Sequence, residues 1–454
     1  MSAIKKFGLI GHPLGHSLSP YIHKRIMEEA GIHGIYTLYD IEEDALETVV
    51  PSLRKELDGF NCTIPYKEKL ISFLDSLDTS ALAYSAVNTV YKGKGYNTDR
   101  AGFLAAAPSL VEKSVLILGA GGVSRMMAYE AAAQNARITI CARNDEKRNA
   151  LIKELQAKMN ADVRGFSDIS EIEKESFDVL LNGTPVGMWP RAKSMPSSTR
   201  IFKKNQKLFD TIYNPSSTMW MMQAQNHGVE VQSGLRMLLL QAVAAQQIWN
   251  PEVVIDMDKM LSILPELSKK LLEIFPVKYV FTGYMGTGKT LLANELAKRL
   301  RAASYDLDKE IVKKEGISIR EIFEKKGESA FREMETACLE DLLKADKSAF
   351  IALGGGAILQ KGTQAVIEKY QAITVYIDSP FDVIWKRISA SKNRPLLGDA
   401  GMSEKERFTK AAALYEARLP VYEKYSDVKI NGNQEKKAVI KEALHILGYG
   451  GQNT

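Results

Sequence analysis

Residues 278–290 read Lys-Tyr-Val-Phe-Thr-Gly-Tyr-Met-Gly-Thr-Gly-Lys-Thr, an apolar run that leads directly into a glycine-rich loop. Residues 278–282 are few enough for one buried strand, and residues 291–300 have the apolar spacing of a helix. A strand, a Gly-x-x-x-x-Gly-Lys-Thr loop and a helix in this order form the pattern of a phosphate-binding P-loop. The sequence therefore predicts an α/β fold around a site for ATP or GTP.

The glycines of this loop matter because they lack a side chain. Gly283, Gly286 and Gly288 let the backbone fold tightly enough for its N–H groups to surround phosphate oxygens, and the following helix N-terminus also favours negative charge. In this motif the lysine reaches the β- and γ-phosphates, and the last hydroxyl binds Mg²⁺. The predicted ATP-binding residues here are Gly283, Gly286, Thr287, Gly288, Lys289 and Thr290, with Thr290 as an Mg²⁺ ligand.

Length and composition limit the class of protein. The 454 residues exceed what one hydrophobic core usually supports, so we expect two or three domains. The 60 basic and 55 acidic residues, without a long block of one sign, favour small anionic substrates over a nucleic-acid partner. The sequence shows no signal segment or membrane-length apolar stretch, and its three scattered cysteines suggest neither disulfides nor a zinc site. We expect a cytoplasmic protein without membrane contact, as a monomer or homodimer.

Strand and helix patterns alternate along the chain, which predicts α/β architecture throughout. A second α/β unit begins with a strand at residues 114–118, and an apolar helix from residue 235 is expected to pack back onto the first domain. The tail from residue 448 has no core-forming pattern, so we expect it to be disordered. The predicted domains are residues 1–104 with 236–260, residues 105–235, a linker at 261–277, and a P-loop domain with a parallel sheet flanked by helices at 278–454.

A second glycine cluster, Gly119-Ala120-Gly121-Gly122, follows the strand at residues 114–118. It is compatible with a Rossmann-like dinucleotide turn or with an ordinary turn between strand and helix, since Ser124 replaces the third glycine of that motif. After the next strand, Arg143 stands where a 2′-phosphate would be met, and no acid stands where a ribose hydroxyl would be bound. This favours NADP over NAD, although Asp145 lies close by.

Six motifs in the first half resemble shikimate dehydrogenase, in the order of that family. They are Gly15-His-Ser-Leu-Ser-Pro, Asn61-Cys-Thr-Ile-Pro-Tyr-Lys, Ala86-Val-Asn-Thr, Asn97-Thr-Asp, Asn182-Gly-Thr-Pro-Val-Gly-Met and Gly234-Leu-Arg-Met-Leu-Leu-Leu-Gln. The resemblance covers residues 5–250 and implies reversible, NADP-dependent reduction of 3-dehydroshikimate to shikimate. Residues 1–104 with 236–260 would then bind shikimate, and residues 105–235 would form a Rossmann-like NADP domain.

The resemblance also implies roles for single residues. Ser17 and Ser19 would hold the substrate carboxylate, and Asn61, Thr63, Asn88 and Gln241 would bind its hydroxyls. NADP would be bound by Gly119, Ala120, Gly121, Gly122, Arg143, Gly234 and Met237, with Tyr213 at the substrate beside the nicotinamide. Tyr213 and Met237 would serve equally well as core residues.

Lys67 and Asp99 are the family's catalytic pair. Hydride transfer to a ketone leaves an alkoxide, so the reaction needs a proton donor beside that oxygen. An ammonium held by a carboxylate can pass such a proton. The alternative is a surface ion pair of little consequence.

Two positions depart from the family's pattern. Arg100 and Ser85 stand where glycine is usual, and a cation beside Asp99 could change the pKa of that carboxyl or narrow the pocket. Quinate-using relatives share much of the pattern, so a quinate/shikimate dehydrogenase remains an alternative.

The second half resembles shikimate kinase over residues 278–430. The motifs are Asp306-Leu-Asp308, Gly327-Glu-Ser-Ala-Phe-Arg-Glu-Met-Glu335, Gly354-Gly-Gly, Asn393-Arg-Pro-Leu-Leu and Tyr415-Glu-Ala-Arg-Leu-Pro-Val-Tyr. The resemblance implies that Arg332 and Arg418 bind the shikimate carboxylate and that Asp308 orients the attacking hydroxyl. It also implies that the backbone of Gly354, Gly355 and Gly356 approaches the shikimate ring. On the nucleotide side, Arg394 would close a lid over the ATP phosphates, and Asp306 would help to hold Mg²⁺.

Together these patterns predict one chain with two enzymes, which uses NADP(H), ATP and Mg²⁺ to make shikimate and then phosphorylate it. A regulatory or binding protein remains an alternative, in which one half has lost its catalytic activity and only senses a ligand.

Overall fold

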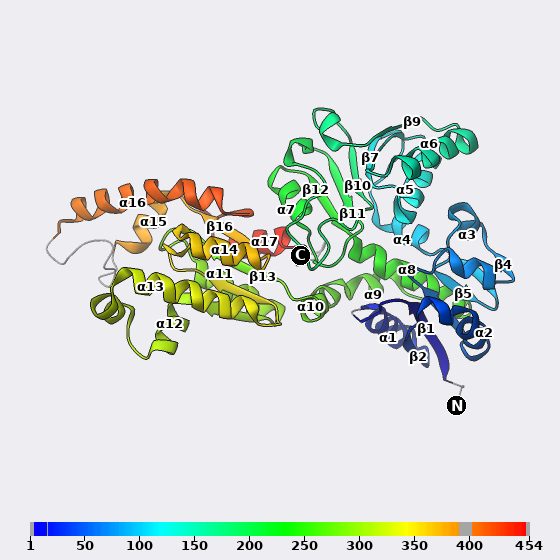
Figure 1. The fold of residues 1–454 in the computed structure, drawn as a ribbon, viewed down its shortest axis with the longest axis horizontal. Helices are drawn as coiled ribbons and strands as arrows, with labels where there is room; N and C mark the ends of the chain where they lie inside the picture. The colour runs from blue at the N-terminus through cyan, green and yellow to red at the C-terminus, as the bar shows by residue number, and fades with distance from the viewer. Residues whose placement is uncertain (1–3, 16, 390–401, 451–454) are drawn as a thin grey trace. The chain divides into compact units, whose positions relative to one another are not determined.

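The computed structural model describes residues 4–15, 17–389 and 402–450. The chain forms two compact units, Met1–Met188 with Met195–Ser268, and Trp189–Ser194 with Lys269–Thr454. Each of the three sheets lies within one unit, and two of them are wholly parallel (Figure 1). The prediction of an α/β fold is therefore confirmed.

The first sheet has the strand order β2-β1-β3-β5-β6-β4. Its strands β1, β2 and β3 are parallel, whereas β5 pairs antiparallel with both β3 and β6. The carboxyl ends of β1 and β3 thus meet at one edge. Its elements are β1 Lys5–Gly11, α1 Ser19–Ala30, β2 Gly34–Asp40, α2 Leu46–Glu56, β3 Gly59–Cys62, β4 Ser76–Leu77, α3 Thr79–Tyr84, β5 Thr89–Tyr91, β6 Lys94–Tyr96 and α4 Asp99–Ala106.

The second sheet has six parallel strands in the order β12-β11-β10-β7-β8-β9. The chain order reverses between β7 and β10, and ligands of such sheets bind in the crevice at this reversal. Helices α5 and α6 pack on β7, β8 and β9, and α7 packs on β11 and β12 (Figure 1). The elements are β7 Ser114–Leu118, α5 Gly122–Ala133, β8 Arg137–Cys141, α6 Asp145–Met159, β9 Val163–Phe166, β10 Val179–Asn182, β11 Lys207–Asp210, α7 Met219–Asn226 and β12 Glu230–Ser233.

Helix α8, Gly234–Trp249, returns from the second sheet to the first. Trp249 at its end stacks on Phe7 of β1 with ring centroids 4.8 Å apart, and its indole N–H donates to the Val90 carbonyl at 3.0 Å. Helix α4 packs closely against α8, since a Cβ on Gly102 would lie 2.6 Å from the Met237 carbonyl oxygen. The apolar surface of α8 is thus covered by the elements of the first sheet.

The third sheet is parallel, with the order β14-β15-β13-β16-β17. Strand β13 lies in the centre, so the loop after it opens at the middle of the carboxyl edge. The elements of this part of the chain are α9 Met257–Ser262, α10 Leu264–Ile274, β13 Lys278–Thr282, α11 Lys289–Leu300, β14 Ala303–Asp306, α12 Leu307–Glu315, α13 Ile319–Lys344, β15 Ala349–Ala352, α14 Lys361–Lys369, β16 Ile373–Asp378, α15 Phe381–Ile388, α16 Glu404–Lys424, β17 Val428–Asn431 and α17 Lys436–Ile446. Helix α13 is kinked at Gly327, whose φ is 82°.

The chain after α17 differs from its sequence prediction. Tyr449 is buried, its hydroxyl lies 3.1 Å from that of Tyr279, and the two rings meet edge to face. The amides of Tyr449 and Gly450 also donate to the Leu444 carbonyl at 2.7 Å and 2.8 Å. One buried aromatic ring and these backbone bonds thus fix a segment that shows no periodic pattern. Residues 451–454 lie outside the described part of the chain.

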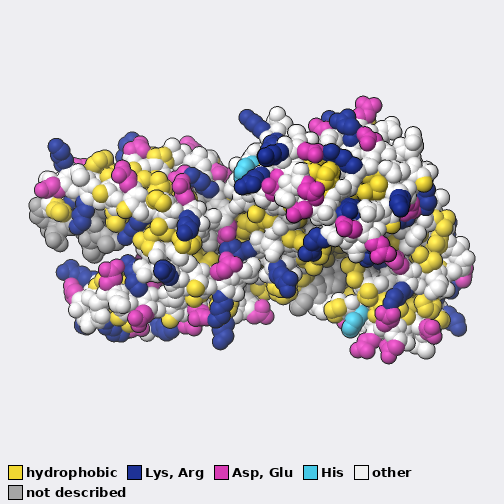
Figure 2. All heavy atoms as spheres, turned by 45° about the horizontal axis from the view of Figure 1, so that its top comes forward, with side chains coloured by type: hydrophobic (Ala, Val, Ile, Leu, Met, Phe, Trp, Pro, Cys, Tyr) yellow, Lys and Arg dark blue, Asp and Glu magenta, His cyan; other side chains and the backbone are white. Residues whose placement is uncertain are grey.

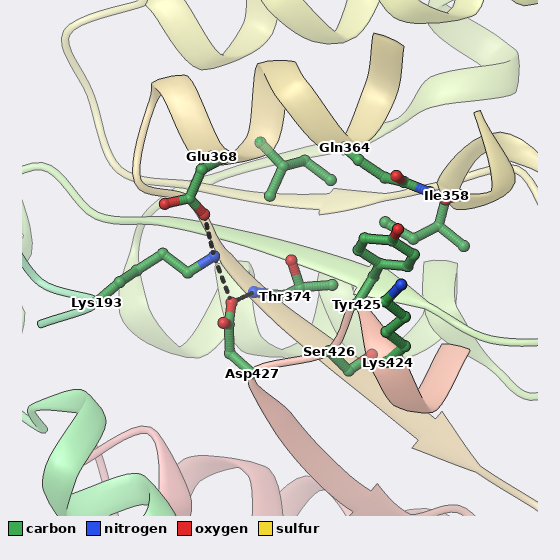
Figure 3. Close-up of a pocket in the computed structure, with 10 residues that line it drawn as sticks. Lys193, Ile358, Gln364, Glu368, Thr374, Lys424, Tyr425, Ser426 and Asp427 are labelled. Carbon is green, nitrogen blue, oxygen red and sulfur yellow. Dashed lines mark hydrogen bonds and ion pairs between the residues drawn. The ribbon is translucent and has the colours of Figure 1, made fainter. Parts of the chain in front are cut away.

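A small hollow of the second unit, with a volume of about 160 Å³, is shown in Figure 3. The Lys193 ammonium lies 2.9 Å from Asp427 and 3.4 Å from Glu368, and the Thr374 amide donates to Asp427 at 2.8 Å. Thr374 and Asp427 stand at the amino ends of β16 and β17, whereas the P-loop follows the carboxyl end of β13. This hollow is therefore not the nucleotide site.

The surface agrees with a mixed-charge protein. Figure 2 shows basic and acidic side chains interspersed over the face that it presents. Among the described residues, no helix is long and apolar enough to cross a membrane.

Candidate active sites

Lys67 and Asp99 meet in the first unit. The Lys67 ammonium lies 2.6 Å from one oxygen of Asp99, and the Asn88 amide donates to the other oxygen at 2.9 Å. The side chains of Lys67 and Asp99 are 26% and 17% exposed, so they are partly sheltered but reachable. Asp99 is the first residue of α4, where the helix dipole favours a carboxylate. Both oxygens of this carboxylate are thus held in place.

The amide groups of Asn61 and Asn88 are already largely engaged. Asn61 donates to the Asn88 carbonyl at 3.1 Å and to the Thr89 hydroxyl at 3.0 Å, while its own oxygen accepts from Tyr36 at 2.8 Å. The Asn88 oxygen accepts from the Thr98 amide at 2.8 Å. The Asn61 side chain is also hydrogen-bonded to His23, so its amide is fully engaged. Within the described part of the chain, one N–H of Asn88 therefore remains for a ligand.

The other predicted shikimate-binding residues lie in neighbouring segments. The Ser17 hydroxyl accepts from the Ser19 amide at 3.2 Å. The methyl group of Thr63 lies 2.6 Å from where Gly11, at the end of β1, would carry a Cβ. Gln241 of α8 accepts from Thr98 at 3.3 Å, one residue before Asp99. Ser17, Ser19 and Thr63 thus follow the adjacent carboxyl ends of β1 and β3.

Both departures from the family pattern have structural explanations. Ser85 has φ 51° and ψ 40°, the left-handed conformation that glycine adopts without strain, so serine is tolerated there at a cost of about 1 kcal/mol. Arg100 does not add a free cation beside Asp99, because its guanidinium donates to Glu130 at 2.8 Å. The expected narrowing of the pocket thus has no support in the contacts of Arg100.

The glycine turn after β7 lies at the reversal of strand order in the second sheet. Gly119 has φ 105°, and a Cβ on Gly121 or Gly122 would meet no atom within 4 Å, which leaves open space at the α5 N-terminus. A bound pyrophosphate needs this combination of exposed amides and space. The turn therefore fits a dinucleotide.

Ser124 replaces the third glycine of the motif without loss of close packing. It is completely buried, and its hydroxyl would lie 2.8 Å from a Cβ on Gly119 and would overlap with one on Gly183. The third glycine normally permits helix and strand to approach. Here the opposing strand end supplies the missing space through Gly183.

The remaining predicted NADP residues have mixed surroundings. Arg143 is exposed directly after β8, and the nearby carboxylate of Asp145 is bound by Arg148, which reduces its competition with a phosphate. Gly234 is required by packing, since a Cβ there would overlap with the Thr211 carbonyl oxygen. Met237 is buried within the hydrophobic core.

Tyr213 and Ala120 complete the predicted residues of the first unit. Tyr213 lies between β11 and α7, and burial raises the pKa of its phenol. Ala120 lies within the glycine turn after β7 and is partly buried. Contacts of Tyr213, Met237 and Gly234 with a nicotinamide stay predictions.

The P-loop has the backbone its sequence predicts. Gly283, Gly286 and Gly288 have φ values of 138°, 82° and 96°. Lys289 is 9% exposed, and its ammonium donates to the carbonyls of Gly283 and Tyr284 at 2.9 Å each. The loop thus holds the lysine over its own backbone, as a phosphate cradle requires. The Thr287 hydroxyl donates to the Tyr284 carbonyl at 2.9 Å and braces the loop.

The two predicted Mg²⁺ ligands are adjacent. The Thr290 hydroxyl donates to Asp306 at 2.6 Å. One hydroxyl and one carboxylate fit Mg²⁺, which usually keeps several waters and takes few protein ligands. When bound, the ion would neutralise charge on the phosphates of ATP.

Asp308 faces the triple-glycine loop across a space with no room for a side chain. A Cβ on Gly354 would lie 2.8 Å from an Asp308 oxygen and 2.7 Å from a Glu335 oxygen. Burial, and then the charge of Asp306, raises the pKa of Asp308. Burial also raises the pKa of Glu335 to about 7. The sequence motif contains Glu335 but predicts no role for it; its three-residue spacing from Arg332 is the signal that could have found it.

Both predicted carboxylate-binding arginines reach the same loop. Arg332 lies 2.7 Å from Glu335, and a Cβ on Gly356 would lie 3.0 Å from its guanidinium. Arg418 is 8% exposed and donates to the Gly355 carbonyl at 3.1 Å. Residues from α12, α13, α16 and the loop after β15 therefore converge on one place.

Two further positions concern the nucleotide. Arg394 lies outside the described residues, so its predicted lid role has no structural description. Arg387 of α15 donates to the P-loop carbonyl of Gly286 at 3.5 Å and to the Gly432 carbonyl at 3.2 Å. The sequence alone does not point to Arg387, since a lone arginine late in a helix carries no pattern of its own.

Known families match both halves of the chain. The family described as shikimate dehydrogenase substrate binding domain matches residues 9–90, and that described as shikimate / quinate 5-dehydrogenase matches residues 104–188. The family described as shikimate kinase matches residues 285–447.

Individual relatives cover the first half. The shikimate dehydrogenase (NADP(+)) of Methanococcus maripaludis is 38% identical over 259 residues, which is 55% of this chain and 92% of the relative. That of Caldanaerobacter subterraneus is 38% identical over 264 residues, 55% of this chain and 93% of the relative. The crystal structure of Thermus thermophilus shikimate 5-dehydrogenase with NADP(H) and shikimate is 30% identical with a TM-score of 0.53, and the match covers 59% of this chain and 100% of that one. The chain therefore belongs to the shikimate dehydrogenase family and carries a shikimate kinase domain behind it, which makes it a two-enzyme fusion of the shikimate pathway.

Proposed function

We propose that this chain performs two consecutive reactions on the same carbon. The first unit reduces the ketone of 3-dehydroshikimate with NADPH, and the second unit transfers the γ-phosphoryl group of ATP to the resulting 3-hydroxyl. One observation carries this proposal: the same chain contains two complete groups of residues. One is the Lys67–Asp99 pair at 2.6 Å, and the other is Asp308 next to Gly354, in a unit with an intact P-loop.

In the reduction, NADPH supplies the hydride when it is bound. Lys67 donates a proton to the ketone oxygen as that oxygen gains negative charge, and Asp99 holds the ammonium in position. Asn88 keeps Asp99 oriented through its hydrogen bond of 2.9 Å. Asn61 supports Asn88 through its bond to the Asn88 carbonyl, and the remaining N–H of Asn88 donates to a substrate hydroxyl. Ser17 and Ser19 bind the carboxylate.

In the phosphorylation, ATP with Mg²⁺ supplies the phosphoryl group. Asp308 accepts the hydrogen bond of the attacking hydroxyl, and its raised pKa makes it a better proton acceptor than an ordinary aspartate. Arg332 and Arg418 bind the shikimate carboxylate, which positions that hydroxyl. Lys289 neutralises charge on the phosphates.

A coupled assay on the intact chain tests the proposal. With 3-dehydroshikimate, NADPH and ATP–Mg²⁺, we expect NADPH oxidation followed by one ADP for each NADPH consumed. If a folded sample consumes only NADPH or only ATP, the unit that uses this cofactor is an enzyme and the other unit is a ligand-binding module. Consumption of neither would overturn the proposal.

The quinate alternative needs its own comparison. We expect kcat/KM for shikimate oxidation to exceed that for quinate, because the proposed second reaction acts on shikimate. Similar values for both compounds would make the first unit a quinate/shikimate dehydrogenase.

Three finer predictions remain attached to this proposal. They are the domain limits given above, a cytoplasmic location, and a monomeric or homodimeric state that sedimentation of the purified chain can decide.

A further inference from the structure

Arg100 adjoins Asp99 but is directed to a different part of the first unit. Its Nε donates to an oxygen of Glu130 at 2.8 Å. Glu130 lies in the third turn of α5, the helix that starts at the dinucleotide turn. The contact therefore joins α4, which begins with Asp99, to the helix expected to hold the cofactor.

Glu130 is too well buried for an ordinary surface ion pair. Its side chain is 7% exposed, although that of Arg100 is 49% exposed. Burial of a carboxylate is costly unless it is paired and hydrogen-bonded, so Glu130 needs its partners. The hydrogen bond to Glu130 correspondingly raises the pKa of the Arg100 guanidinium. This distinguishes the contact from exposed pairs that contribute little.

Tyr84 donates to the same carboxylate oxygen from a third element. Its hydroxyl is hydrogen-bonded to Glu130, and its ring meets that of Tyr129 edge to face at 5.9 Å. Burial, and then the bond to Glu130, raises the pKa of the Tyr84 phenol, so it remains a donor at neutral pH. Tyr84 ends α3, four residues before Asn88.

Glu130 thus holds the two segments that position Asp99. Arg100 is the residue after Asp99 in the chain. Tyr84 is four residues before Asn88, and the Asn88 amide donates to the Asp99 carboxylate at 2.9 Å. The distance along α5 from its first residue, Gly122, to Glu130 is about 12 Å at the usual rise of a helix. Helix α5 therefore connects the cofactor turn to Glu130, and Glu130 contacts the residue that follows Asp99.

We propose that Arg100, Glu130 and Tyr84 form a positioning cluster that sets the Lys67–Asp99 pair at the correct distance from the nicotinamide. This inference rests on the proposed dehydrogenase function. Hydride transfer is sensitive to small errors in the position of its partners, so loosening the cluster slows the chemical step more than it weakens substrate binding.

The test uses Glu130→Gln and Arg100→Met in the full chain. Each should lower kcat for shikimate oxidation about tenfold, with less than about a twofold change in the KM for shikimate. The deuterium isotope effect with NADPH labelled at C4 should increase in the reverse direction, because hydride transfer becomes more rate-limiting. Arg100→Lys should restore at least half of kcat, and the double variant should lose no more than either single variant.

Glu173→Gln is the matched control. Glu173 is also a largely buried carboxylate, 12% exposed, that lies 3.8 Å from an arginine, Arg200, and accepts from the Ser198 hydroxyl. None of these three residues lies in α3, α4 or α5. Glu173→Gln should lower stability without changing the isotope effect. Kinase activity of the same samples reports the folding of the second unit.

The outcomes distinguish failure of the positioning cluster from failure of the dehydrogenase function. Absence of shikimate oxidation in the unaltered chain defeats the proposed function itself. A normal kcat in Glu130→Gln, additive losses in the double variant, or an equal kcat loss in Glu173→Gln overturns the positioning role alone.

Discussion

In the proposed reduction, the ion pair of Lys67 and Asp99 matters for the chemistry but contributes little to the stability of the fold. Both side chains are partly exposed, and pairs of this kind contribute about 0–1 kcal/mol to folding. Proton transfer by a positioned group, in contrast, contributes about 10²–10⁴-fold to a rate.

We therefore expect Lys67→Met to reduce kcat for shikimate oxidation by about 10²–10⁴-fold without unfolding the chain. Lys69→Met, which removes a lysine paired with Glu43 at the surface, is the matched control and should leave kcat unchanged. Steady-state kinetics with both variants check this. A similar loss in both would assign the effect to charge in general.

Asp210, again a single residue, makes the stability of the fold depend on pH. It is completely buried, accepts hydrogen bonds from Asn182, Ile212 and Thr218, and burial raises its pKa to about 7. The native chain keeps this proton up to about pH 7, whereas the unfolded chain loses it near pH 4. This group therefore lowers the free energy of unfolding as the pH rises through that interval, by at most about 1.4 kcal/mol for each pH unit.

Asp210→Asn removes that contribution, so the variant should gain stability relative to the unaltered chain as the pH rises from about 4 to about 7. The urea concentration that halves dehydrogenase activity measures this at each pH. Parallel curves for both proteins would contradict the prediction.

At the scale of elements, α5 and the end of β10 pack closely although Ser124 stands in place of the third glycine of the dinucleotide motif. Ser124 fits because Gly183 opposite it has no side chain. We expect Gly183→Ala to raise the KM for NADP several-fold in the native chain, since its Cβ would overlap with the Ser124 hydroxyl.

Gly183→Ala should raise the KM for NADP much less in a chain that also carries Ser124→Gly, because the hydroxyl is then absent. The other close atom, the Met127 methyl group at 2.8 Å, ends a flexible side chain that can move. The double-mutant cycle should give a coupling of about 1–3 kcal/mol in NADP binding. Independent, additive effects would show that the two positions do not share one space.

The elements also show what sequence can and cannot predict. Strand 114–118 is predictable because a buried parallel strand is a nearly continuous apolar run, and the P-loop is predictable because its residues are local in the sequence. The partners of Arg100 and Ser124 are not, since Glu130 and Gly183 are distant from them in sequence. The burial of Tyr449 also escapes prediction, because one aromatic side chain makes no periodicity.

At the scale of the whole molecule, each unit should work without catalysis in the other. Lys289→Met should reduce phosphoryl transfer by at least about 10²-fold, since the phosphate charge loses its cation. NADPH oxidation by the same protein should continue at the original rate and shikimate should accumulate. A parallel fall in NADPH oxidation would show that the first reaction depends on the second site.

The hydrogen bonds of Asn88 would give the proposed first site a chemical filter. Its oxygen accepts from the Thr98 amide, which can only donate, and one of its N–H groups donates to Asp99, so the orientation of the amide is fixed. What remains is one N–H, which recognises a lone pair and repels a positive charge. An ammonium group in place of the hydroxyl has nearly the right size and polarity but brings no lone pair. Asn88 would thus reject ammonium mimics of shikimate at that carbon while it accepts an ether, a selection by hydrogen-bond direction and not by shape.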